Sequence, residues 1–573
     1  MTTNHADISN KVNLVTNIAN KLRGPYTPEK YGSVIIPMAI LRRFDCVLEE
    51  KNHEIRRVLN KLKAVENGKI LEEAVNKQCG VPFYNEKCVT FEQLVGDSDN
   101  ITSNFLEYIG AFSPSIARIV QGLKFREEVE FMAKKGLLFQ VVKAFSEVDF
   151  HPDTTDPLSM GYIFEDIIRK YKANAEAGDH YTPREIIELC VSLMTAENIE
   201  HLKSEGKIIR VYDGCCGTGG MLTVTKRKLV DDGIAKSNYV RLFGQDFNPE
   251  AYAVCCAEMM FLGESPENIY ENNTLTEDRF TGQRFDLLIT NPPFGVEWKP
   301  EKDFVEKETS KPNNRFVAGL PRINDGQLLF IQNMIAKADD HARIAIIFNG
   351  SPLFSGDAGS GESEVRRYCL ENNLLEAIIA LPDQMFYNTG INTYIWILSK
   401  TKSRRRDGKV QLINATDLWE EMKPKSLGNK RKRISDDNRK DILRVYQAFE
   451  ENERSKIFDI KDFGYNKVVV ERPMRDADGN LILKKGQKQP DVSLRDTENV
   501  PLKQDIQDYF AKEVLPFVPD AWVDESKTKI GYEIPLTRYF YKYTPPQRSE
   551  EILKNVLALE ASIATRLGDI LHE

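Results

Sequence analysis

The sequence predicts an α/β protein with a mixed, mostly parallel β-sheet, preceded by an all-α N-terminal domain and followed by a C-terminal helical tail. Two observations lead to this fold class. From about residue 158 to residue 400, short β-branched runs alternate with helical stretches, which is typical of a parallel sheet flanked by helices. Before residue 157 and after residue 549, apolar residues recur instead at helical spacing.

Length and composition indicate a globular chain of several domains. The 573 residues exceed what one hydrophobic core holds, and we expect three domains at 1–157, 158–475 and 476–573. Hydrophobic residues make up 41% and charged residues 29%, the balance of an ordinary soluble protein. We find no long apolar run and no signal peptide in the polar start, so we expect no membrane span and a cytoplasmic location.

The cysteines and histidines predict no metal site. The nine cysteines are scattered without Cys-x-x-Cys spacing, and the adjacent pairs Cys215–Cys216 and Cys255–Cys256 are poorly placed to hold an ion. We expect reduced thiols, as is usual inside cells. The seven histidines do not cluster along the sequence.

The N-terminal region is predicted to be helical. A first helix is marked by apolar residues at helical spacing, namely Val12, Val15, Ile18, Ala19 and Leu22. Gly24–Pro25 ends this run, and a second apolar helix is predicted over residues 34–44. The turn-rich segment 151–157 predicts a junction between domains.

The central region predicts a sheet whose functional groups follow the strands. Buried strands are predicted at 208–212, 240–243, 285–290, 344–348, 377–381 and 394–398. Sites in such sheets lie at the carboxyl ends of the strands, and the motifs described below follow predicted strands.

The C-terminal region is polar. The basic runs Arg404–Arg406 and Lys430–Arg433 are interpreted as solvated faces, with phosphate contact as the alternative. Residues 476–496 are predicted to form a loop. A terminal helix is predicted over 549–571, and it carries a coiled-coil-like seam formed by Ile552, Val556, Leu559, Ile563 and Ile570. This seam could pack on the protein itself or on a partner.

A glycine-rich turn follows the first predicted strand. In the turn Asp213 to Gly220, the glycines let the backbone approach a ligand closely. The absence of GxxxxGK[ST] excludes a P-loop nucleotide triphosphatase. Asp246 ends the next strand, where an acidic side chain can accept hydrogen bonds from ribose hydroxyls. Asn248 is the better candidate for the following helix N-cap, which leaves Asp246 for the ligand.

Upstream of the turn, residues 178–184 predict the start of a helix. Thr182 is expected to cap it and Pro183 to fit its first turn. A helix N-terminus presents free N–H groups that suit a carboxylate.

The most specific motif is Asn291-Pro292-Pro293-Phe294, directly after a predicted strand. A planar amino group such as N6 of adenine is a poor nucleophile because its lone pair is delocalised. The side-chain carbonyl of Asn291 and the backbone carbonyl of Pro292 can accept from its two N–H bonds. The prolines preorganise the turn, and Phe294 offers a ring for a base to stack on. The target base must leave the duplex to reach such a site.

These motifs, in this order, resemble the amino-methyltransferases of the gamma arrangement. The resemblance to the modification subunit of type I restriction-modification systems spans roughly residues 10–470, and it is carried by 22–24, 31–32, 208–221, 291–295, 325–330, 346–354, 385–391 and 426–430. It implies a Rossmann-like methyltransferase domain that transfers a methyl group from S-adenosylmethionine to N6 of a flipped adenine in duplex DNA.

The resemblance also implies roles for individual residues. The side chains expected along the methionine part of the cofactor are Asp179, His180, Tyr181, Thr182, Pro183 and Arg184. Those expected in or beside the glycine turn are Asp213, Cys215, Cys216, Gly217 and Gly219. Asp246 is expected to hold the ribose. Asn291, Pro292, Pro293 and Phe294 are expected to bind and activate adenine. Gly214 replaces the family's usual proline, and we interpret this change as added flexibility.

Partners are implied as well. In this family a separate specificity subunit reads the DNA sequence, usually with two modification subunits, and a restriction (translocase) subunit can join them. The net charge of −8 agrees, because proteins that bind DNA unaided are usually basic. We expect the terminal seam to dock to a helix of the specificity subunit, and the long polar segment 295–324 to form a mobile loop on the DNA side.

Two other functions fit parts of the pattern. Enzymes that methylate a glutamine amide in proteins use a similar tetrapeptide, usually ending in tyrosine, but Phe294 and the helical N-terminal region favour adenine. A non-catalytic assembly protein could keep the fold, although the presence of Asn291 and Asp246 argues against it.

Overall fold

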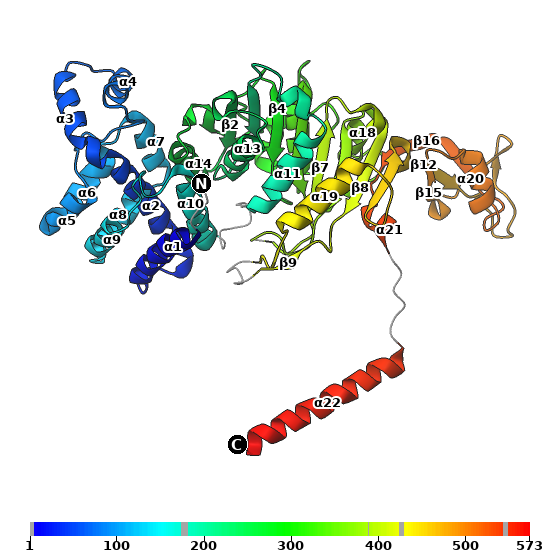
Figure 1. Cartoon of the computed structure of the whole chain (residues 1–573). Coiled ribbons are helices and arrows are strands. Elements are labelled where there is room, and N and C mark those ends of the chain that lie inside the picture. Colours follow the sequence, from blue (N-terminus) through cyan, green and yellow to red (C-terminus); the bar gives the residue numbers. More distant parts are fainter. Residues whose placement is uncertain (1–4, 173–181, 388, 423–428, 542–547, 573) are drawn as a thin grey trace. The chain divides into compact units, whose positions relative to one another are not determined.

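The computed structural model describes residues 5–172, 182–387, 389–422, 429–541 and 548–572. The chain forms two compact units, Met1–Ile534 and Pro535–Glu573. Figure 1 shows the whole chain with many of its elements labelled.

The first region of the large unit is all-helical, as predicted. Its helices are α1 (His5–Ala19), α2 (Gly32–Leu48), α3 (Asn52–Lys61), α4 (Gly68–Cys79), α5 (Phe91–Gly96), α6 (Ile101–Gly110), α7 (Pro114–Gly122), α8 (Phe125–Lys134) and α9 (Leu138–Ser146). Val15, Ile18 and Leu22 are fully buried, so the predicted apolar stripe faces the core. Gly24 has a φ of 104°, a conformation that suits glycine and directs the chain out of the first helix.

A nine-stranded mixed sheet forms the centre, with strand order β11-β8-β6-β7-β5-β4-β1-β2-β3. The strands are β1 (Ile209–Asp213), β2 (Val240–Asp246), β3 (Ile269–Glu271), β4 (Phe285–Thr290), β5 (Ala338–Phe348), β6 (Leu375–Ala380), β7 (Tyr394–Ser399), β8 (Lys409–Asn414) and β11 (Ser455–Asp459). The run β3-β2-β1-β4-β5 is parallel, whereas β7 pairs antiparallel with both of its neighbours. The α/β class is confirmed.

All six predicted strands are present, and within this nine-stranded sheet the prediction missed three others. The missed strands β3, β8 and β11 lie toward the two edges of the sheet. β3 has only three residues, and the sequence of β8, KVQLIN, mixes polar with apolar side chains. Their pairing comes from neighbouring strands rather than from a local apolar run.

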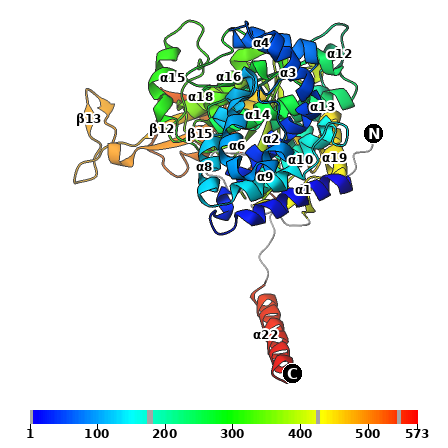
Figure 2. The same ribbon diagram turned by 90° about the vertical axis from the view of Figure 1, so that its left-hand side faces the viewer.

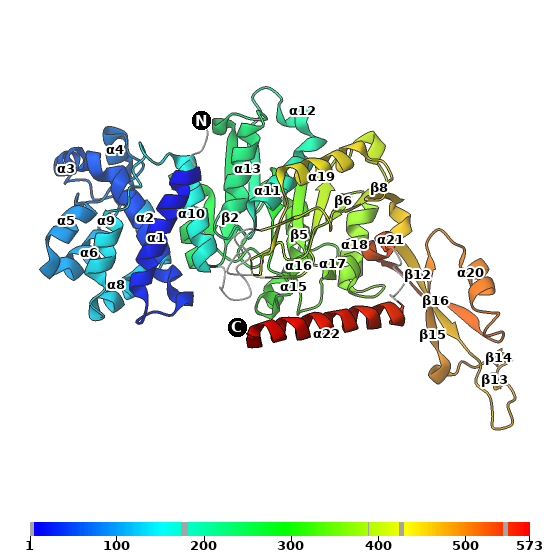
Figure 3. The ribbon, with the colours of Figure 1, turned by 60° about the horizontal axis from the view of Figure 1, so that its bottom comes forward.

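Helices cover both faces of the sheet (Figure 3). On one face α11 packs against α13 and α19, and on the other α16 packs against α18. The helices of this region are α10 (Pro157–Lys172), α11 (Arg184–Ala196), α12 (Ile199–Leu202), α13 (Gly220–Asp231), α14 (Pro249–Phe261), α15 (Lys302–Thr309), α16 (Gln327–Lys337), α17 (Ser351–Phe354), α18 (Gly361–Glu371) and α19 (Asp436–Ala448). The N-terminal helices join the sheet through α10 and α14.

A small antiparallel sheet, β15-β12-β16, ends the large unit. The remaining elements are β9 (Glu420–Glu421), β10 (Lys432–Arg433), β12 (Gly464–Glu471), β13 (Leu483–Lys484), β14 (Gln487–Lys488), β15 (Asp496–Pro501), β16 (Trp522–Tyr532) and α20 (Ile506–Glu513). The segment predicted as a loop contains the β13–β14 hairpin, which Figure 2 shows extending beyond the small sheet.

The basic runs differ from their prediction at two residues, Arg406 and Lys430, which form internal contacts, whereas Arg404, Arg405 and Arg433 are exposed as predicted. Arg406 is fully buried, its guanidinium lies 3.3 Å from Glu197, and it stacks over the ring of Tyr446. Lys430 is also buried, and its ammonium lies 2.6 Å from the carboxylate of Glu185. The fold brings acidic partners that are distant in sequence, so these cations stabilise the protein itself.

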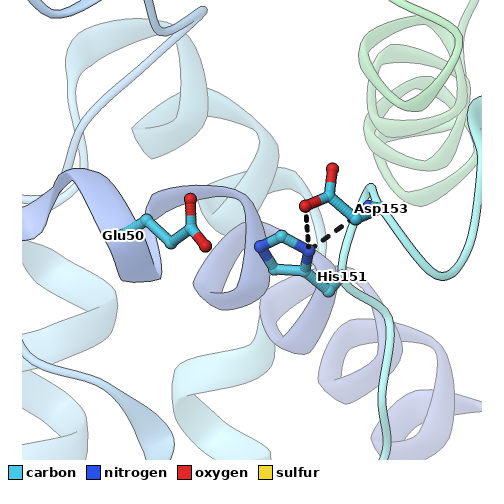
Figure 4. Close-up of side chains that lie close together, drawn as sticks. All are labelled: Glu50, His151 and Asp153. Carbon is cyan, nitrogen blue, oxygen red and sulfur yellow. Dashed lines mark hydrogen bonds and ion pairs between the residues drawn. The ribbon is translucent and has the colours of Figure 1, made fainter.

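The cysteines agree with their prediction, whereas some of the histidines lie closer together than predicted. All nine cysteines are free, in agreement with the expected reduced thiols. The histidines are less dispersed than predicted, because the rings of His201 and His341 lie 4.6 Å apart. His151 also meets Glu50 and Asp153 (Figure 4). The Asp153 backbone N–H donates to His151 Nδ1 at 3.3 Å and both carboxylates are exposed, so we assign this group to the turn that begins α10.

The small unit contains α21 (Leu536–Phe540) and the terminal helix α22 (Ser549–His572). The predicted terminal helix is therefore present. Its apolar side chains are about half exposed or more, with Ile552 at 48%, Val556 at 51% and Leu559 at 63%. The side chain of Ile570, which belongs to the predicted seam, is not among those that the structure describes. Over the described part of the chain, no helix is both long and apolar enough to cross a bilayer.

Candidate active site

The predicted motifs meet at the carboxyl ends of the central parallel strands. The glycine turn follows β1, Asp246 ends β2, and Asn291 follows β4. Because β1 lies between β2 and β4, these three groups share one edge of the sheet. The site therefore depends on the strand order.

Asp213, at the end of β1, is fully buried and supports the turn. One carboxylate oxygen, Oδ1, accepts from the backbone N–H of Cys215 at 3.0 Å and from the hydroxyl of Thr290 at 2.6 Å. The other oxygen, Oδ2, is buried, and no described residue forms a hydrogen bond with it. Burial raises the pKa of this carboxyl to about 7, despite the lowering effect of its two donors. An unpaired buried acceptor of this kind fits a donor or cation supplied by a ligand.

The glycines of the turn meet steric requirements. A Cβ on Gly214 would lie 2.8 Å from the hydroxyl oxygen of Tyr212 and 3.2 Å from Nδ2 of Asn333. This corrects the interpretation of Gly214 as added flexibility, because close packing requires glycine there. Gly219 combines a φ of +94° with a position where a Cβ would lie 2.8 Å from Sγ of Cys255.

The thiols beneath the turn are neutral. Burial raises the pKa of Cys215 well above its usual value, and the nearby carboxylate of Asp213 raises it further. Sγ of Cys215 lies 2.8 Å from Oγ1 of Thr290. Thr290 was not among the site residues predicted from the sequence. The two cysteines therefore shape the turn and are not thiolate nucleophiles.

Asp246 shapes the turn as well as facing a cavity. Its carboxylate accepts from the backbone N–H groups of Gly217 at 2.8 Å and Asn248 at 2.9 Å. Asn248 caps α14 as predicted, but Asp246 is not left solely for a ligand, which corrects that inference. A cavity of about 100 Å³ lies beside it, bordered by Phe247, Trp298 and Phe330 among others. None of these three aromatic residues had been predicted, since no local pattern distinguishes them.

The amide of Asn291 is held from one side only. It is 7% exposed, and its Nδ2 donates to the hydroxyl oxygen of Thr182 at 2.9 Å. Its Oδ1 is buried and has no hydrogen-bond partner among the residues that the structure describes. The ring of Phe294 lies close by and packs edge-on against Phe386, with ring centroids 6.3 Å apart.

The upstream segment differs from its prediction in the cap of its helix. Pro183 occupies the N-cap position of α11 and none of the described side chains caps this helix, so Thr182 is not the cap. Arg184 stacks 3.7 Å above the ring of Tyr162 and pairs with Glu188 at 3.5 Å, so its guanidinium has a packing role. Asp179, His180 and Tyr181 lie outside the described residues.

The segment 295–324 contains a helix and buried side chains where a loop was predicted. It contains α15, and its Trp298, Val305 and Phe316 form a small core with Leu329 of α16. The indole N–H of Trp298 donates to the carbonyl of Arg322 at 2.9 Å. Buried apolar side chains thus hold this segment as a wall beside the cavity.

The fold and the site together define the class of protein. A sheet covered on both faces, with a glycine turn after its first strand and Asn-Pro-Pro-Phe after its fourth, is the architecture of a methyltransferase that acts on a planar amino group. The chain belongs to the N-6 DNA methylase family, which matches residues 156–493. Residues 12–145 match the HsdM N-terminal domain. The protein is a DNA adenine-N6 methyltransferase, the modification subunit of a type I restriction-modification system.

The chain is similar in sequence and in fold to known methylase subunits of type I restriction enzymes. The chain is 23% identical over 487 residues to the type I restriction enzyme MjaIX methylase subunit of Methanocaldococcus jannaschii, covering 80% of each chain. It is 27% identical over 264 residues to the HindI methylase subunit of Haemophilus influenzae, covering 45% of this chain and 54% of that one. The type I methyltransferase subunit from Streptococcus thermophilus matches its fold with a TM-score of 0.64 at 19% identity, covering 80% of this chain and 97% of the other.

Proposed function

We propose that the methyl donor is S-adenosylmethionine and that it binds at the turn after β1. The supporting observation is the unpaired, buried Oδ2 of Asp213, at the base of a turn whose Cys215, Cys216 and Gly217 border a small cavity. Asp213 and the backbone of Cys215 to Gly219 would hold the methionine part, and Asp246 the ribose. The bound cofactor supplies a methyl group on a sulfonium, which is already activated for transfer.

A glycine substitution tests this placement. We expect Gly219→Ala to raise the Kd for S-adenosylmethionine by about tenfold or more, because a left-handed φ costs an L-residue ~1–2 kcal/mol and the new Cβ would meet Cys255. Gly220→Ala is the matched control, since its Cβ would find Ile187 only at 3.9 Å. Isothermal titration calorimetry measures both constants. Equal affinities in the two variants would contradict the placement.

The pKa of Asp213 predicts a pH dependence of cofactor binding. The carboxyl is protonated below its pKa of about 7 and ionised above it. A positively charged ligand prefers the ionised form, so we expect affinity to rise as the pH rises from 6 to 8, by up to about tenfold per unit below the pKa. The same binding titrations with Asp213→Asn, whose side chain cannot ionise, measure the part of the pH dependence that comes from the ligand itself. An unchanged pH profile in that variant would remove Asp213 from the binding of the cation.

For the target base, we propose that Oδ1 of Asn291 and the carbonyl of Pro292 accept from the adenine amino group. The single observation that carries this proposal is the buried, unpaired Oδ1. When both carbonyl oxygens accept from the N–H bonds, electron density shifts toward the adenine nitrogen, which then attacks the methyl group more readily. Pro293 stiffens the turn, and the exposed part of the Phe294 ring can stack on the base, which is worth ~1–3 kcal/mol in single-strand binders.

The overall reaction can be tested directly. We expect labelled methyl groups from S-adenosylmethionine to appear at adenine N6 of duplex DNA when the cognate specificity subunit is present. Incorporation should fall strongly without that subunit, since a chain with a net charge of −8 is poorly suited to bind DNA alone. Equal incorporation by the isolated chain would contradict this division of labour. We further propose that a second modification subunit and a restriction (translocase) subunit join the complex.

The terminal helix α22 is the part of the chain that we propose binds the specificity subunit. We expect the exposed apolar stripe of α22 to dock to a helix of the specificity subunit, because such a stripe is stabilised by a partner that removes it from water. Deleting residues 549–573 should abolish or greatly weaken co-purification with that subunit. Reversing the charges of Glu550 and Glu551 leaves the stripe intact and is the control. A complex of normal size formed by the truncated chain would refute this role.

A further inference from the structure

The Asn291 amide has two ends, and only one of them suits the reaction. An amide carries one acceptor oxygen and an NH2 group with two donors. The amino group of adenine is itself a donor, so an NH2 group turned toward it would repel it. The rate therefore depends on what holds this side chain and which end it presents.

The side chain that contacts this amide is Thr182, which precedes Asn291 by 109 residues. Its hydroxyl oxygen accepts from Nδ2 of Asn291 at 2.9 Å, and Thr182 is only 6% exposed. Turning the amide over would place two N–H donors where the unpaired Oδ1 now lies. Buried N–H groups without acceptors are rarer in proteins than under-satisfied carbonyls, so the observed orientation is favoured.

Thr182 is rigidly mounted. It precedes Pro183, which restricts its backbone to extended conformations. The carbonyl of Pro183 accepts from the N–H groups of Ile186 and Ile187 at 3.0 and 3.2 Å, which joins the segment to α11. Ile186 and Ile187 are buried against the rest of the protein. The hydroxyl therefore has a fixed position from which to orient a second side chain.

We propose that Thr182 is a positioning residue for methyl transfer, whose hydroxyl holds the Asn291 amide with Oδ1 directed at the amino group of the target base. This inference rests on the proposed role of Asn291. It differs from the cofactor-binding role that the resemblance implies for Thr182. Both residues border a small cavity with Cys215, Cys216 and Gly217, so the two roles predict different kinetics.

The first test compares Thr182→Val with Thr182→Ser in the full chain assembled with its specificity subunit. Valine keeps the shape and removes the acceptor, whereas serine keeps the hydroxyl. We expect valine to lower the single-turnover rate at saturating cofactor and DNA by about tenfold, the size of one ordinary hydrogen bond. Serine should recover most of that rate. Cofactor Kd and the thermal unfolding midpoint should stay close to wild type in both variants.

Two outcomes would overturn the proposal. A valine variant with a normal saturated rate and a raised KM for S-adenosylmethionine would make Thr182 a cofactor ligand. A serine variant as slow as valine would show that the hydroxyl is not what matters. If valine lowers the unfolding midpoint, rates are compared at a temperature where both variants are fully folded.

A double-mutant cycle separates this proposal from the function on which it rests. If Thr182 acts through Asn291, then Thr182→Val should cost no further rate in an Asn291→Ala background. The same tenfold loss in both backgrounds would overturn the positioning role while leaving Asn291 in place. A wild-type rate for Asn291→Ala alone would instead refute the proposed role of Asn291.

Discussion

Replacing Asn291 by alanine should lower the rate of methyl transfer by about 10²- to 10³-fold, as removal of a preorganised electrostatic contact does in other enzymes. The reason is the buried Oδ1, which has no hydrogen-bond partner among the described residues and which we propose accepts from the amino group of adenine. Cofactor binding should change little, because the proposed contacts to S-adenosylmethionine come from the turn after β1. Single-turnover transfer of labelled methyl groups to cognate duplex DNA measures the effect.

The control for this substitution is another asparagine on the same sheet domain. Asn372 lies exposed at the end of α18, where its Nδ2 donates to the carbonyl of Tyr368 at 2.9 Å. Asn372→Ala should leave the transfer rate unchanged. If Asn291→Ala keeps more than about a third of the wild-type rate with cofactor bound, the acceptor role proposed for Oδ1 is wrong.

The largest effect on stability is expected at Glu376. Its two carboxylate oxygens accept from the guanidinium of Arg343 at 2.8 and 2.7 Å, and both residues are buried beneath Tyr446. Burial alone would raise the pKa of Glu376, but the charge of Arg343 outweighs it and the pKa is lowered. Glu376→Leu leaves a buried cation without its partner, so we expect the free energy of unfolding to fall by about 3–5 kcal/mol.

Urea unfolding followed by circular dichroism measures this loss. Replacing both partners, Arg343→Met with Glu376→Leu, should recover much of it, because the buried guanidinium is then removed together with its carboxylate partner. The control is Asp417→Ala, which removes an exposed ion pair with Arg454 and should cost about 1 kcal/mol or less. A double variant no more stable than Glu376→Leu would show that the loss comes from altered packing rather than from the unpaired charge.

The sequence predicted those parts of the fold that depend on local pattern. Strands such as β4, in which every residue is buried, are visible as apolar runs, and the Asn248 cap follows from a side chain that bonds its own helix. The family resemblance rested on motifs of the same local kind. Segments whose order comes from distant contacts were missed, among them β8 and the wall formed around Trp298.

By itself, the sequence determined which chemical groups stand at the ends of the central strands, and hence the class of reaction. The tertiary structure decided which of these groups meet. It joined Thr182 to Asn291 and paired Arg406 with Glu197, although neither contact leaves a signal along the chain. The physical reason is that apolar periodicity and capping act over a few residues, whereas hydrogen bonds and ion pairs depend on strand order and helix packing. Those partners exist only once the sheet has formed.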